Sequence, residues 1–289
     1  MINIHISFVI LHYITIEDTI ECITSIVNNI KYKDKSIIVV DNGSPNGTGD
    51  KLLEKYKDDD TVYIIISKEN LGFAKGNNLG FKYAKHNKKA DFIVMINNDT
   101  YINQENFCHS IINEYEREKF HICGPNIISL VDNQKQNPIP RLFNNVQEVK
   151  NKVSRFKILM SLSYISGDVI MLKIVEFKNS LKKNNNHKEE RNDYKLHGSC
   201  MIFSPIFIDK YEGLYDKTFM YGEEDIIRYI ADRDGLNMLY SENMTIYHKE
   251  DSATNASLNK GGKKRRFYYK NSIDSCNELI NLMDKTIID

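Results

Sequence analysis

The stretch of sequence that decides the fold is DFIVMINNDT, residues 91–100. Its first six residues are mostly apolar and β-rich, which predicts a short buried strand. The strand is followed at once by Asn97, Asn98 and Asp99, whose side chains offer amide and carboxylate oxygens. In open α/β sheets, ligands bind at the carboxyl ends of the strands, and such oxygens suit Mg²⁺ or Mn²⁺. Alone, the residues also fit an ordinary Asn/Asp turn, so the neighbouring motifs must decide.

Composition is that of an ordinary globular protein. The 289 residues are 41% hydrophobic and 27% charged, which is ample for a core. Lys+Arg and Asp+Glu balance at 39 each, so the net charge gives no argument for nucleic acid as a partner. The five cysteines form no CxxC pair, which predicts a reducing, cytoplasmic compartment. We expect neither a signal peptide nor a transmembrane helix, because the apolar stretches are interrupted by polar residues.

Strand-like and helix-like patterns alternate through the first hundred residues. We expect strands over 4–11, 36–41, 62–67 and 91–97, separated by helices over about 15–27, 50–56 and 73–86. Alternation at this spacing predicts an α/β fold, with a Rossmann-like, mostly parallel central sheet flanked by helices. Farther on, the sequence predicts a charged helix over about 146–183, a strand ending at residue 248 and an amphipathic C-terminal helix.

Asp41 ends the second predicted strand. A carboxylate at this place commonly accepts a hydrogen bond from a bound nucleoside. A dinucleotide site would also need a GxGxxG motif after the first strand, but residues 11–15 read LHYIT, which disfavours NAD. The alternative for Asp41 is a turn or helix-capping role.

The sequence NLGFAKGNNLG, residues 70–80, indicates an anion site. Gly72 permits a close approach of the backbone, and the start of a helix favours anions. Lys75 lies in the first helical turn, where the helix dipole favours an acid, so a bound diphosphate would explain it. Gly76 and Gly80 suggest close packing on the sheet or on a ligand. The alternative is a glycine-rich helix start with a solvated lysine.

Three consecutive acids open another apparent helix: Glu223, Glu224 and Asp225. Acids in a first helical turn are often simple caps. In a cleft, however, one of several adjacent carboxylates can act as a general base. His248 ends the last strand-like run and is a candidate nitrogen ligand for a metal beside Asp99, although a lone histidine is more often structural.

Taken in order, these motifs resemble the family 2 glycosyltransferases of the GT-A fold, especially the bacterial rhamnosyltransferase-like branch. The resemblance covers about residues 4–252, apart from an unmatched region over about 131–195. Each motif is weak alone, and their shared order carries the argument. The matching pieces are VVDNGS (39–44), NLGFAKGNN (70–78), NNDT (97–100), YGEED (221–225), and His248 with Ser252.

The resemblance implies a nucleoside-diphosphate sugar donor, such as a dTDP- or UDP-sugar, and Mn²⁺ or Mg²⁺. Nucleobase and ribose would be held by His12, Tyr13 and Asp41, and the diphosphate by Asn70, Gly72 and Lys75. Asn97, Asn98 and Asp99 stand where the family has its DxD motif, so Asp99 and His248 are the implied metal ligands. Asn97 replaces the first Asp of that motif, which leaves its part in metal binding open.

The resemblance also implies a reaction that inverts the anomeric centre in one displacement. The general base is one of Glu223, Glu224 and Asp225, with Glu224 favoured, and the acceptor is a hydroxyl of a glycan or lipid-linked saccharide in bacterial surface polysaccharide synthesis. In this organisation, residues 1–130 bind the donor within a single GT-A domain. Residues 131–255 form the acceptor and base half, with a variable insertion over about 131–195, and residues 256–289 form a basic, aromatic tail.

Two other functional classes are compatible with parts of this pattern. A catalytically silent sugar-nucleotide or glycan-binding module is disfavoured by the intact acids. A sugar nucleotidyltransferase is disfavoured because the loop after the first strand lacks glycine. The tail sequence KKRRFYY, residues 263–269, predicts peripheral contact with an anionic membrane at its inner face, or else a solvated helix start.

Overall fold

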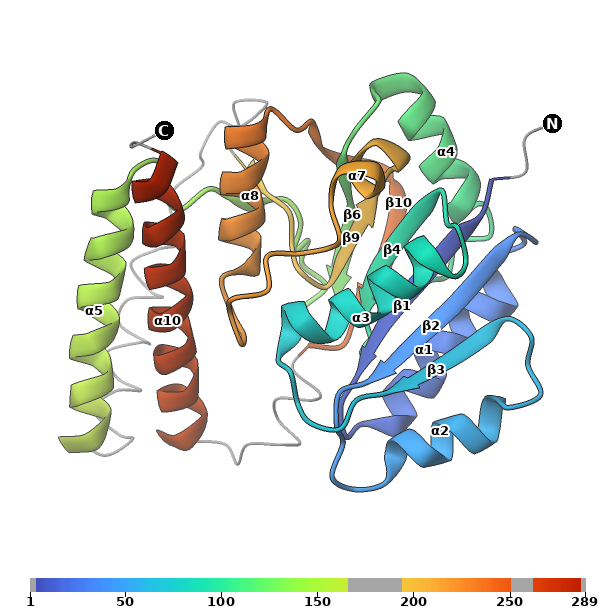
Figure 1. Cartoon of the computed structure of the whole chain (residues 1–289), viewed down its shortest axis with the longest axis horizontal. Helices are drawn as coiled ribbons and strands as arrows, with labels where there is room; N and C mark the ends of the chain where they lie inside the picture. The colour runs from blue at the N-terminus through green and yellow to red at the C-terminus, as the bar shows by residue number, and fades with distance from the viewer. Residues whose placement is uncertain (1–3, 166–193, 251–261, 287–289) are drawn as a thin grey trace.

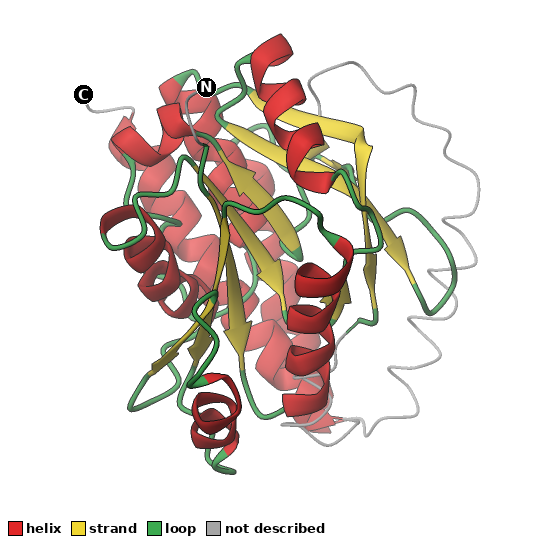
Figure 2. Cartoon of the chain, turned by 90° about the vertical axis from the view of Figure 1, so that its right-hand side faces the viewer, coloured by secondary structure: helices red, strands yellow, loops and turns green. Residues whose placement is uncertain are grey.

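A single mixed sheet forms the centre of the protein. The computed structural model describes residues 4–165, 194–250 and 262–286, and the helices lie on both sides of the strands (Figures 1 and 2). The strand order in this sheet is β3-β2-β1-β4-β9-β6-β10-β5. Its strands are β1 (Ile6–His12), β2 (Lys35–Asp41), β3 (Val62–Ile66), β4 (Phe92–Asn97), β5 (Thr100–Tyr101), β6 (Ile122–Ser129), β9 (Cys200–Phe203) and β10 (Met238–His248).

The sheet has a parallel half and a mixed half. Strands β3, β2, β1 and β4 are parallel to one another, as right-handed crossover units require. Strand β9 pairs antiparallel with both β4 and β6, while β10 is parallel to β6 and antiparallel to β5. Strand β9 therefore joins the two halves into one sheet.

Alternating side chains of each strand serve two separate cores. Phe8 and Ile10 point to one face of β1, where they pack with helices α1 (Ile16–Asn29), α2 (Thr48–Tyr56) and α4 (Phe107–Glu118). Val9 points to the other face, toward α3 (Phe73–His86), α7 (Pro205–Lys210) and α8 (Glu223–Asp234). This two-sided burial explains why the strands read as nearly continuous apolar runs.

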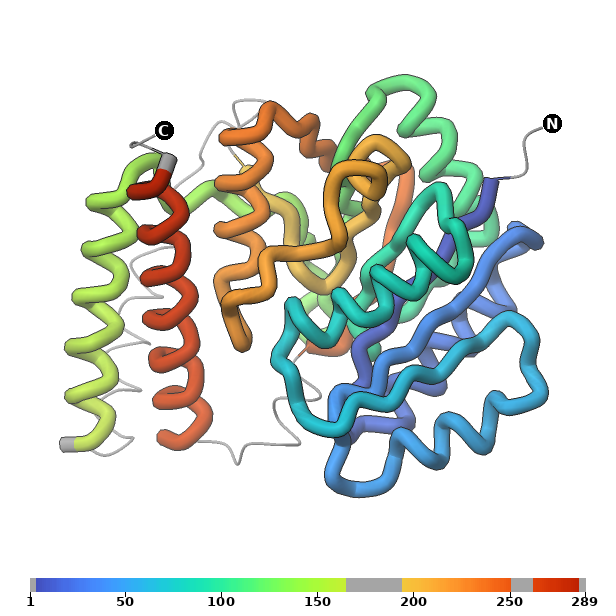
Figure 3. Tube along the Cα trace, viewed as in Figure 1, coloured from blue at the N-terminus to red at the C-terminus, as the bar shows by residue number. Residues whose placement is uncertain are grey.

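Two long helices form a third layer outside α8. Helix α5 (Val146–Ile165) and helix α10 (Gly262–Thr286) lie side by side and run in opposite directions (Figure 3). Their apolar side chains form a separate core with Ile226 and Ile230 of α8. Strands β7 (Ile139–Pro140) and β8 (Tyr194–Lys195) form a small antiparallel pair. In the chain, β7 comes between β6 and α5, and β8 comes between α5 and β9.

The predicted elements of the first hundred residues agree with the observed ones to within about two residues. The helix expected over 146–183 is observed as α5 to residue 165, and its remainder lies outside the described residues, as does Ser252. Within the described part of the chain, no helix combines the length and the apolar character needed to cross a membrane.

The close packing expected from Gly76 and Gly80 is observed against the sheet. A Cβ atom placed on Gly80 would lie 2.4 Å from a methyl group of Val9, and one on Gly76 would lie 2.6 Å from a methyl group of Leu11. Both distances are far shorter than a carbon–carbon contact allows. The two glycines therefore permit helix α3 to lie directly on strands β1 and β2.

We expect Gly80→Ala to destabilise the fold by about 1–3 kcal/mol, because overpacking against β-branched Val9 outweighs the better helix propensity of alanine. The measurement is the free energy of unfolding in urea. Lys82→Ala, at an exposed position of the same helix, is the control and should stay within about 0.5 kcal/mol of the wild type. A Gly80→Ala variant as stable as the wild type would contradict the packing argument.

Candidate functional site

A cavity of about 730 Å³ opens where the parallel strands end. One wall consists of the segments that follow β1, β2 and β4, together with the start of α3. The end of β10 lies beside the turn after β4, and the remaining wall consists of the start of α8 and one face of α10. The predicted site residues that line this cavity are Tyr13, Asn70, Gly72, Asn97, Asn98, Asp99, Glu223, Glu224, Asp225 and His248.

Three predicted donor-binding residues do not line the cavity. His12 is fully buried, and its Nδ1 and Nε2 lie 2.7 Å and 2.9 Å from the hydroxyls of Thr19 and Thr48, so both ring nitrogens are engaged. Burial lowers the pKa of His12. A neutral, enclosed imidazole supports the loop that follows β1, and it offers no surface to a nucleotide.

Asp41 and Lys75 are also placed away from the cavity wall. Asp41 is 3% exposed, and a Cβ on Gly49 would lie 2.3 Å from its Oδ2, so the carboxylate is packed inside its turn. Lys75 is exposed on the first turn of α3. Neither residue lines the cavity, so a ligand contact by either of them stays a prediction from the sequence.

Asn42, the residue after Asp41, lies at the cavity where the sequence had predicted Asp41. Its side-chain amide donates to Asn70 Oδ1 and to the Gly72 carbonyl, each at 3.1 Å. Asn42 Oδ1 accepts from the Leu71 N–H at 2.9 Å. Asn42 therefore shapes the loop at the start of α3, which residue type and strand position alone did not single out.

The start of α3 is partly occupied by the protein itself. The Phe73 N–H donates to the Phe219 carbonyl at 2.7 Å, and a Cβ on Gly72 would lie 2.2 Å from that oxygen. Gly72 has a φ of 82°, in the region that favours glycine. The glycine is thus required by the approach of the 219–222 loop. One of the backbone donors expected for a diphosphate is satisfied by that loop.

The turn after β4 is held by its own side chains. Asn98 Nδ2 donates to the hydroxyls of Thr15 and Thr19 at 2.9 Å and 3.0 Å, and Thr100 Oγ1 donates to the Asn97 carbonyl at 2.6 Å. These bonds fix the turn that carries Asp99. Asn97 and Asn98 also line the cavity, so the turn is observed, and ligand binding by this motif stays a prediction.

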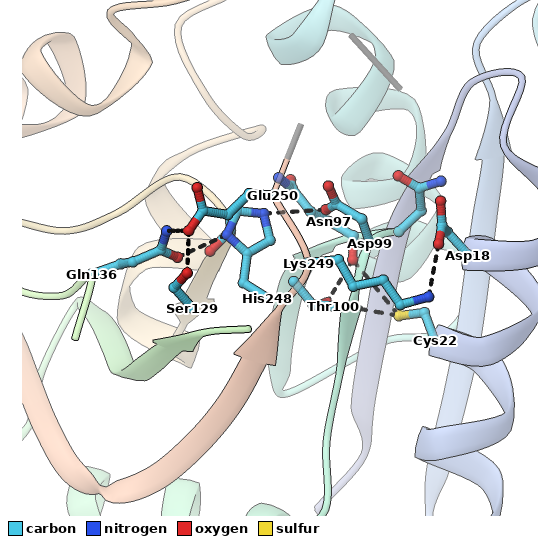
Figure 4. Close-up of polar contacts among 12 residues, drawn as sticks. Asp18, Cys22, Asn97, Asp99, Thr100, Ser129, Gln136, His248, Lys249 and Glu250 are labelled. Atoms are coloured by element: carbon cyan, nitrogen blue, oxygen red, sulfur yellow. Dashed lines mark hydrogen bonds and ion pairs between the residues drawn. The ribbon is translucent and has the colours of Figure 1, made fainter. Parts of the chain in front are cut away.

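Asp99 faces His248 across the sheet (Figure 4). Asp99 Oδ1 lies 3.3 Å from His248 Nε2, and both side chains are 8% exposed. The Lys249 N–H donates to the Asp99 carbonyl at 2.9 Å, and its ammonium pairs with Asp18 and Glu21 of α1. These contacts fasten the end of β10 beside the turn that carries Asp99.

The Asp99–His248 pair fits a divalent cation of the Mg²⁺ or Mn²⁺ type. Two ligand atoms on adjacent positions of such an ion lie roughly 3 Å apart, close to the observed separation. Among the described residues, no group of three or more His, Cys, Asp and Glu side chains is arranged to hold a metal. These two residues would therefore supply part of the coordination shell, and oxygens of a bound diphosphate and water would supply the rest.

The three acids of α8 have three different environments. Asp225 Oδ1 forms an ion pair with Lys195 Nζ at 2.6 Å. Glu223 is buried, and burial, followed by the charge of Glu224, raises its pKa to about 8. Glu224 is half-buried at the cavity wall, and its Oε1 would lie 2.8 Å from a Cβ placed on Gly198. Glu224 thus sits over a glycine, facing the ligand space.

His197, which the sequence did not single out, lines the same cavity as Glu224 and His248. Its ring lies 5.7 Å from that of His248 in an edge-to-face arrangement. The Ser199 N–H donates to His197 Nδ1 at 3.1 Å, and burial lowers the pKa of His197. The only sequence signal for it was the HGS tripeptide before a strand, which carries no distinctive spacing.

Aromatic side chains line the remaining wall. Phe219, Tyr221, Phe267 and Tyr268 all border the cavity, and Phe219 and Tyr268 are each 39% exposed. The Phe267 ring lies 6.3 Å from the rings of both Phe219 and Tyr221. The wall is therefore an apolar surface next to the acids at the start of α8.

Sequence comparisons place the chain among proteins that build glycans. Residues 7–203 match the model of the family described as "Glycosyl transferase family 2". The hexosyltransferase Agl10 of low-salt glycan biosynthesis in Haloferax volcanii is 24% identical over 236 residues, which cover 81% of this chain and 63% of that protein. A poly-beta-1,6-N-acetyl-D-glucosamine synthase of Staphylococcus aureus is 33% identical over 99 residues, 32% of this chain and 23% of the synthase. The chain thus spans less than two thirds of these relatives.

Comparison with solved structures shows the GT-A fold. Staphylococcus aureus TarS in complex with UDP-GlcNAc superposes with a TM-score of 0.55 at 11% identity, over 86% of this chain and 59% of TarS. GalNAc-T7 with UDP, GalNAc and Mn²⁺ has a TM-score of 0.60 at 11% identity, over 87% of this chain and 45% of that protein. With the family match across β1 to β9, these findings show that the chain belongs to glycosyl transferase family 2.

Proposed function

We propose that the protein transfers a sugar from a nucleoside-diphosphate sugar to a hydroxyl of a saccharide acceptor in glycan synthesis. The observation that carries this proposal is the arrangement of one cavity, which is lined by Asp99 and His248 on one side and by Glu224 on another. Family membership and glycan-building relatives support it. The dTDP- and UDP-sugars are the donors to test first, since a structural neighbour was solved with UDP-GlcNAc.

The proposed donor pocket lies at the ends of β1, β2 and β4. Tyr13, Asn42 and Asn70 border the space for the nucleoside, and Asp99 with His248 marks the end that receives the diphosphate. A divalent cation held by that pair would offset the charge that develops on the leaving diphosphate. The neighbour solved with Mn²⁺ supports a cation of this kind.

We propose Glu224 as the general base. It deprotonates the acceptor hydroxyl while the oxygen attacks the anomeric carbon, and the bond from that carbon to the diphosphate breaks on the opposite side. The proton moves to Glu224, and the anomeric centre is inverted. Asp225 is held by Lys195, and Glu223 is enclosed and retains its proton near neutral pH, so Glu224 is the best placed of the three acids.

The aromatic wall supports a saccharide or lipid-linked saccharide as the acceptor. Sugar rings present C–H faces that pack on aromatic rings, while their hydroxyls remain free for hydrogen bonds. Phe219, Tyr221, Phe267 and Tyr268 offer such faces at the side of the cavity that holds Glu224. The more specific rhamnosyltransferase-like assignment, and a part in bacterial surface polysaccharide synthesis, remain predictions from the sequence motifs.

Peripheral contact with the cytoplasmic face of a membrane, predicted for residues 263–269, is a further part of the proposal, and we add the neighbouring helix α5 to the contact surface. Ile158 and Tyr164 at the end of α5 are 62% and 71% exposed, with the exposed Arg155 and Lys157 nearby. Arg266 of α10 packs beside the end of α5, with its guanidinium 4.9 Å from the Tyr164 ring centre. The next residue in the chain, Phe267, lines the cavity. Exposed apolar and basic residues together suit an anionic lipid surface.

We expect Glu224→Gln to lower the rate of sugar transfer by about 10²- to 10⁴-fold, because the amide cannot accept the proton. Binding of the nucleotide sugar should be unchanged. The assay follows release of nucleoside diphosphate from a panel of UDP- and dTDP-sugars, with Glu116→Gln at an exposed position of α4 as the control.

Normal turnover by Glu224→Gln would remove Glu224 from the base role. Release of pyrophosphate would indicate a nucleotidyltransferase, and binding without turnover by the wild type would indicate a silent module.

Glu223 should make the stability of the wild type depend on pH. Its folded pKa of about 8 lies above the ordinary value of 4.5, so the folded state disfavours ionisation. The contribution of protonated Glu223 to the free energy of unfolding is fully present below pH 4.5, and it is lost as the pH rises through about 8. We expect Glu223→Gln to flatten this loss, by up to about 4 kcal/mol, in urea unfolding measured across that range. Parallel pH profiles for the variant and the wild type would contradict the buried position of Glu223.

We expect the protein to sediment with vesicles containing an anionic phospholipid and not with vesicles of phosphatidylcholine alone. Ile158→Asp should weaken that binding roughly tenfold, because an apolar contact is replaced by a charge that the membrane repels. Val131→Asp is the matched control, since Val131 is 70% exposed elsewhere on the molecule. Equal weakening by both variants, or no vesicle binding by the wild type, would refute the proposed contact.

A further inference from the structure

A chain of hydrogen-bonded polar groups lies on the side of the His248 ring that is away from Asp99 (Figure 4). It runs from Ser129 at the end of β6, through Glu250 and Gln136, to the ring of His248. Ser129 is 1% exposed, and its Oγ accepts from the Val131 N–H at 3.1 Å, so its hydroxyl hydrogen is free to donate to Glu250 Oε1. The proposed metal pair thus has an ordered layer of side chains behind it.

These hydrogen bonds determine how the Gln136 amide is oriented. Gln136 Nε2 donates to Glu250 Oε1 at 2.8 Å, and a carboxylate can only accept. The amide oxygen of Gln136 must therefore face His248, whose Nδ1 lies 2.8 Å away. A carbonyl oxygen is only an acceptor, so Nδ1 of His248 carries a proton and donates it.

The orientation of Gln136 has a direct consequence for the other nitrogen. In a neutral imidazole with a proton on Nδ1, Nε2 has a lone pair. That lone pair points toward Asp99 Oδ1 at 3.3 Å, so two electron-rich atoms face each other. A cation between them resolves the conflict, and a proton is the alternative. The hydrogen-bonded chain thus prepares His248 as a ligand.

We propose that Gln136, supported by Glu250 and Ser129, is a positioning residue that holds His248 as the Nδ1–H tautomer with Nε2 directed at the metal position. This inference rests on the proposed function, because it concerns the cation that the proposed transfer uses. Second-layer partners of metal-binding histidines commonly set the ring orientation and tautomer in this way. Gln136 belongs to the region that matched no motif in the sequence.

The backbone around Gln136 supports this role. The Gln136 N–H donates to the Ile127 carbonyl at 2.8 Å, and the Leu130 N–H donates to the His248 carbonyl at 2.9 Å. The segment is therefore fastened both to β6 and to the end of β10. Its side chain reaches His248 from a fixed base, which a merely mobile surface glutamine would lack.

The first test measures Mn²⁺ affinity of the full chain by titration calorimetry. We expect Gln136→Met, which keeps the volume but removes both hydrogen bonds, to weaken Mn²⁺ binding about 10- to 100-fold. Glu250→Gln should weaken it less, because Gln136 keeps its contact with His248 but loses the fixed orientation. Gln134→Met, at an exposed position two residues away, is the matched control and should bind as the wild type does.

The second test reads the tautomer directly, without metal or donor, and so separates this inference from the proposed function. Nitrogen-15 spectra of histidine-labelled protein should show His248 with a protonated Nδ1, its signals being assigned by their loss in His248→Gln. Gln136→Met should shift these signals toward a mixture of tautomers. Wild-type spectra with the proton on Nε2, or wild-type Mn²⁺ affinity in Gln136→Met, would overturn the inference. A wild type that binds no Mn²⁺ but shows the expected tautomer would refute only the metal-assisted reaction.

Discussion

The antiparallel pairing of β9 with β4 and β6 is the interaction on which the rest of the structure depends. A parallel sheet alone would end at β4, with Asp99 at its last turn and no opposing wall. Because β9 enters between β4 and β6, strand β10 follows on the far side of β6. The end of β10 pairs there with β5, with His248 opposite Thr100, and this pairing brings His248 Nε2 within 3.3 Å of Asp99 Oδ1. The Asn97 N–H donates to the Ser199 carbonyl at 2.9 Å, which ties the two halves at the cavity itself.

The cavity gathers groups with opposite electrostatic requirements in a small space. In the proposed reaction, Asp99 and His248 hold a cation, whereas Glu224 must remain able to accept a proton. Burial of Glu223, whose pKa is raised to about 8, reduces the number of negative charges near Glu224 at neutral pH. The ion pair between Lys195 and Asp225 neutralises the third acid. The structure thereby isolates one carboxylate from a run of three that the sequence presents as equivalent.

Helix α10 of the outer layer contributes residues both to the cavity wall and to the core that it shares with α5. Phe267 and Tyr268 of α10 border the cavity, while Tyr269 packs into the core shared with α5 and α8. Successive residues of one helix therefore face the ligand space and the interior. The tail is part of the cavity wall, which neither the membrane interpretation nor the solvated-helix interpretation of its sequence had included.

Local pattern was sufficient for the elements up to β4, because apolar period and turn residues encode strands and helices directly. It also singled out Asp99, Glu224 and His248, which the structure brings to one cavity, since each lies at or next to the end of a strand or the start of a helix. It was insufficient for His12 and Asp41, because burial depends on what packs above a loop. It missed Asn42, Gln136 and His197, which contact residues distant in the sequence, the first two through hydrogen bonds and His197 through its ring.

The sequence by itself determined the α/β class, the edge of the sheet that carries polar side chains, and the set of candidate acids. Tertiary structure decided which acid of the three is buried and which is ion-paired, which residues besides the predicted ones line the cavity, and which loop residue stays buried. The physical reason is the sequence separation of the interacting residues. Secondary structure and turn chemistry depend on neighbours a few residues apart. Burial and hydrogen-bond partners instead depend on contacts such as Gln136 with His248, which are 112 residues apart in the chain.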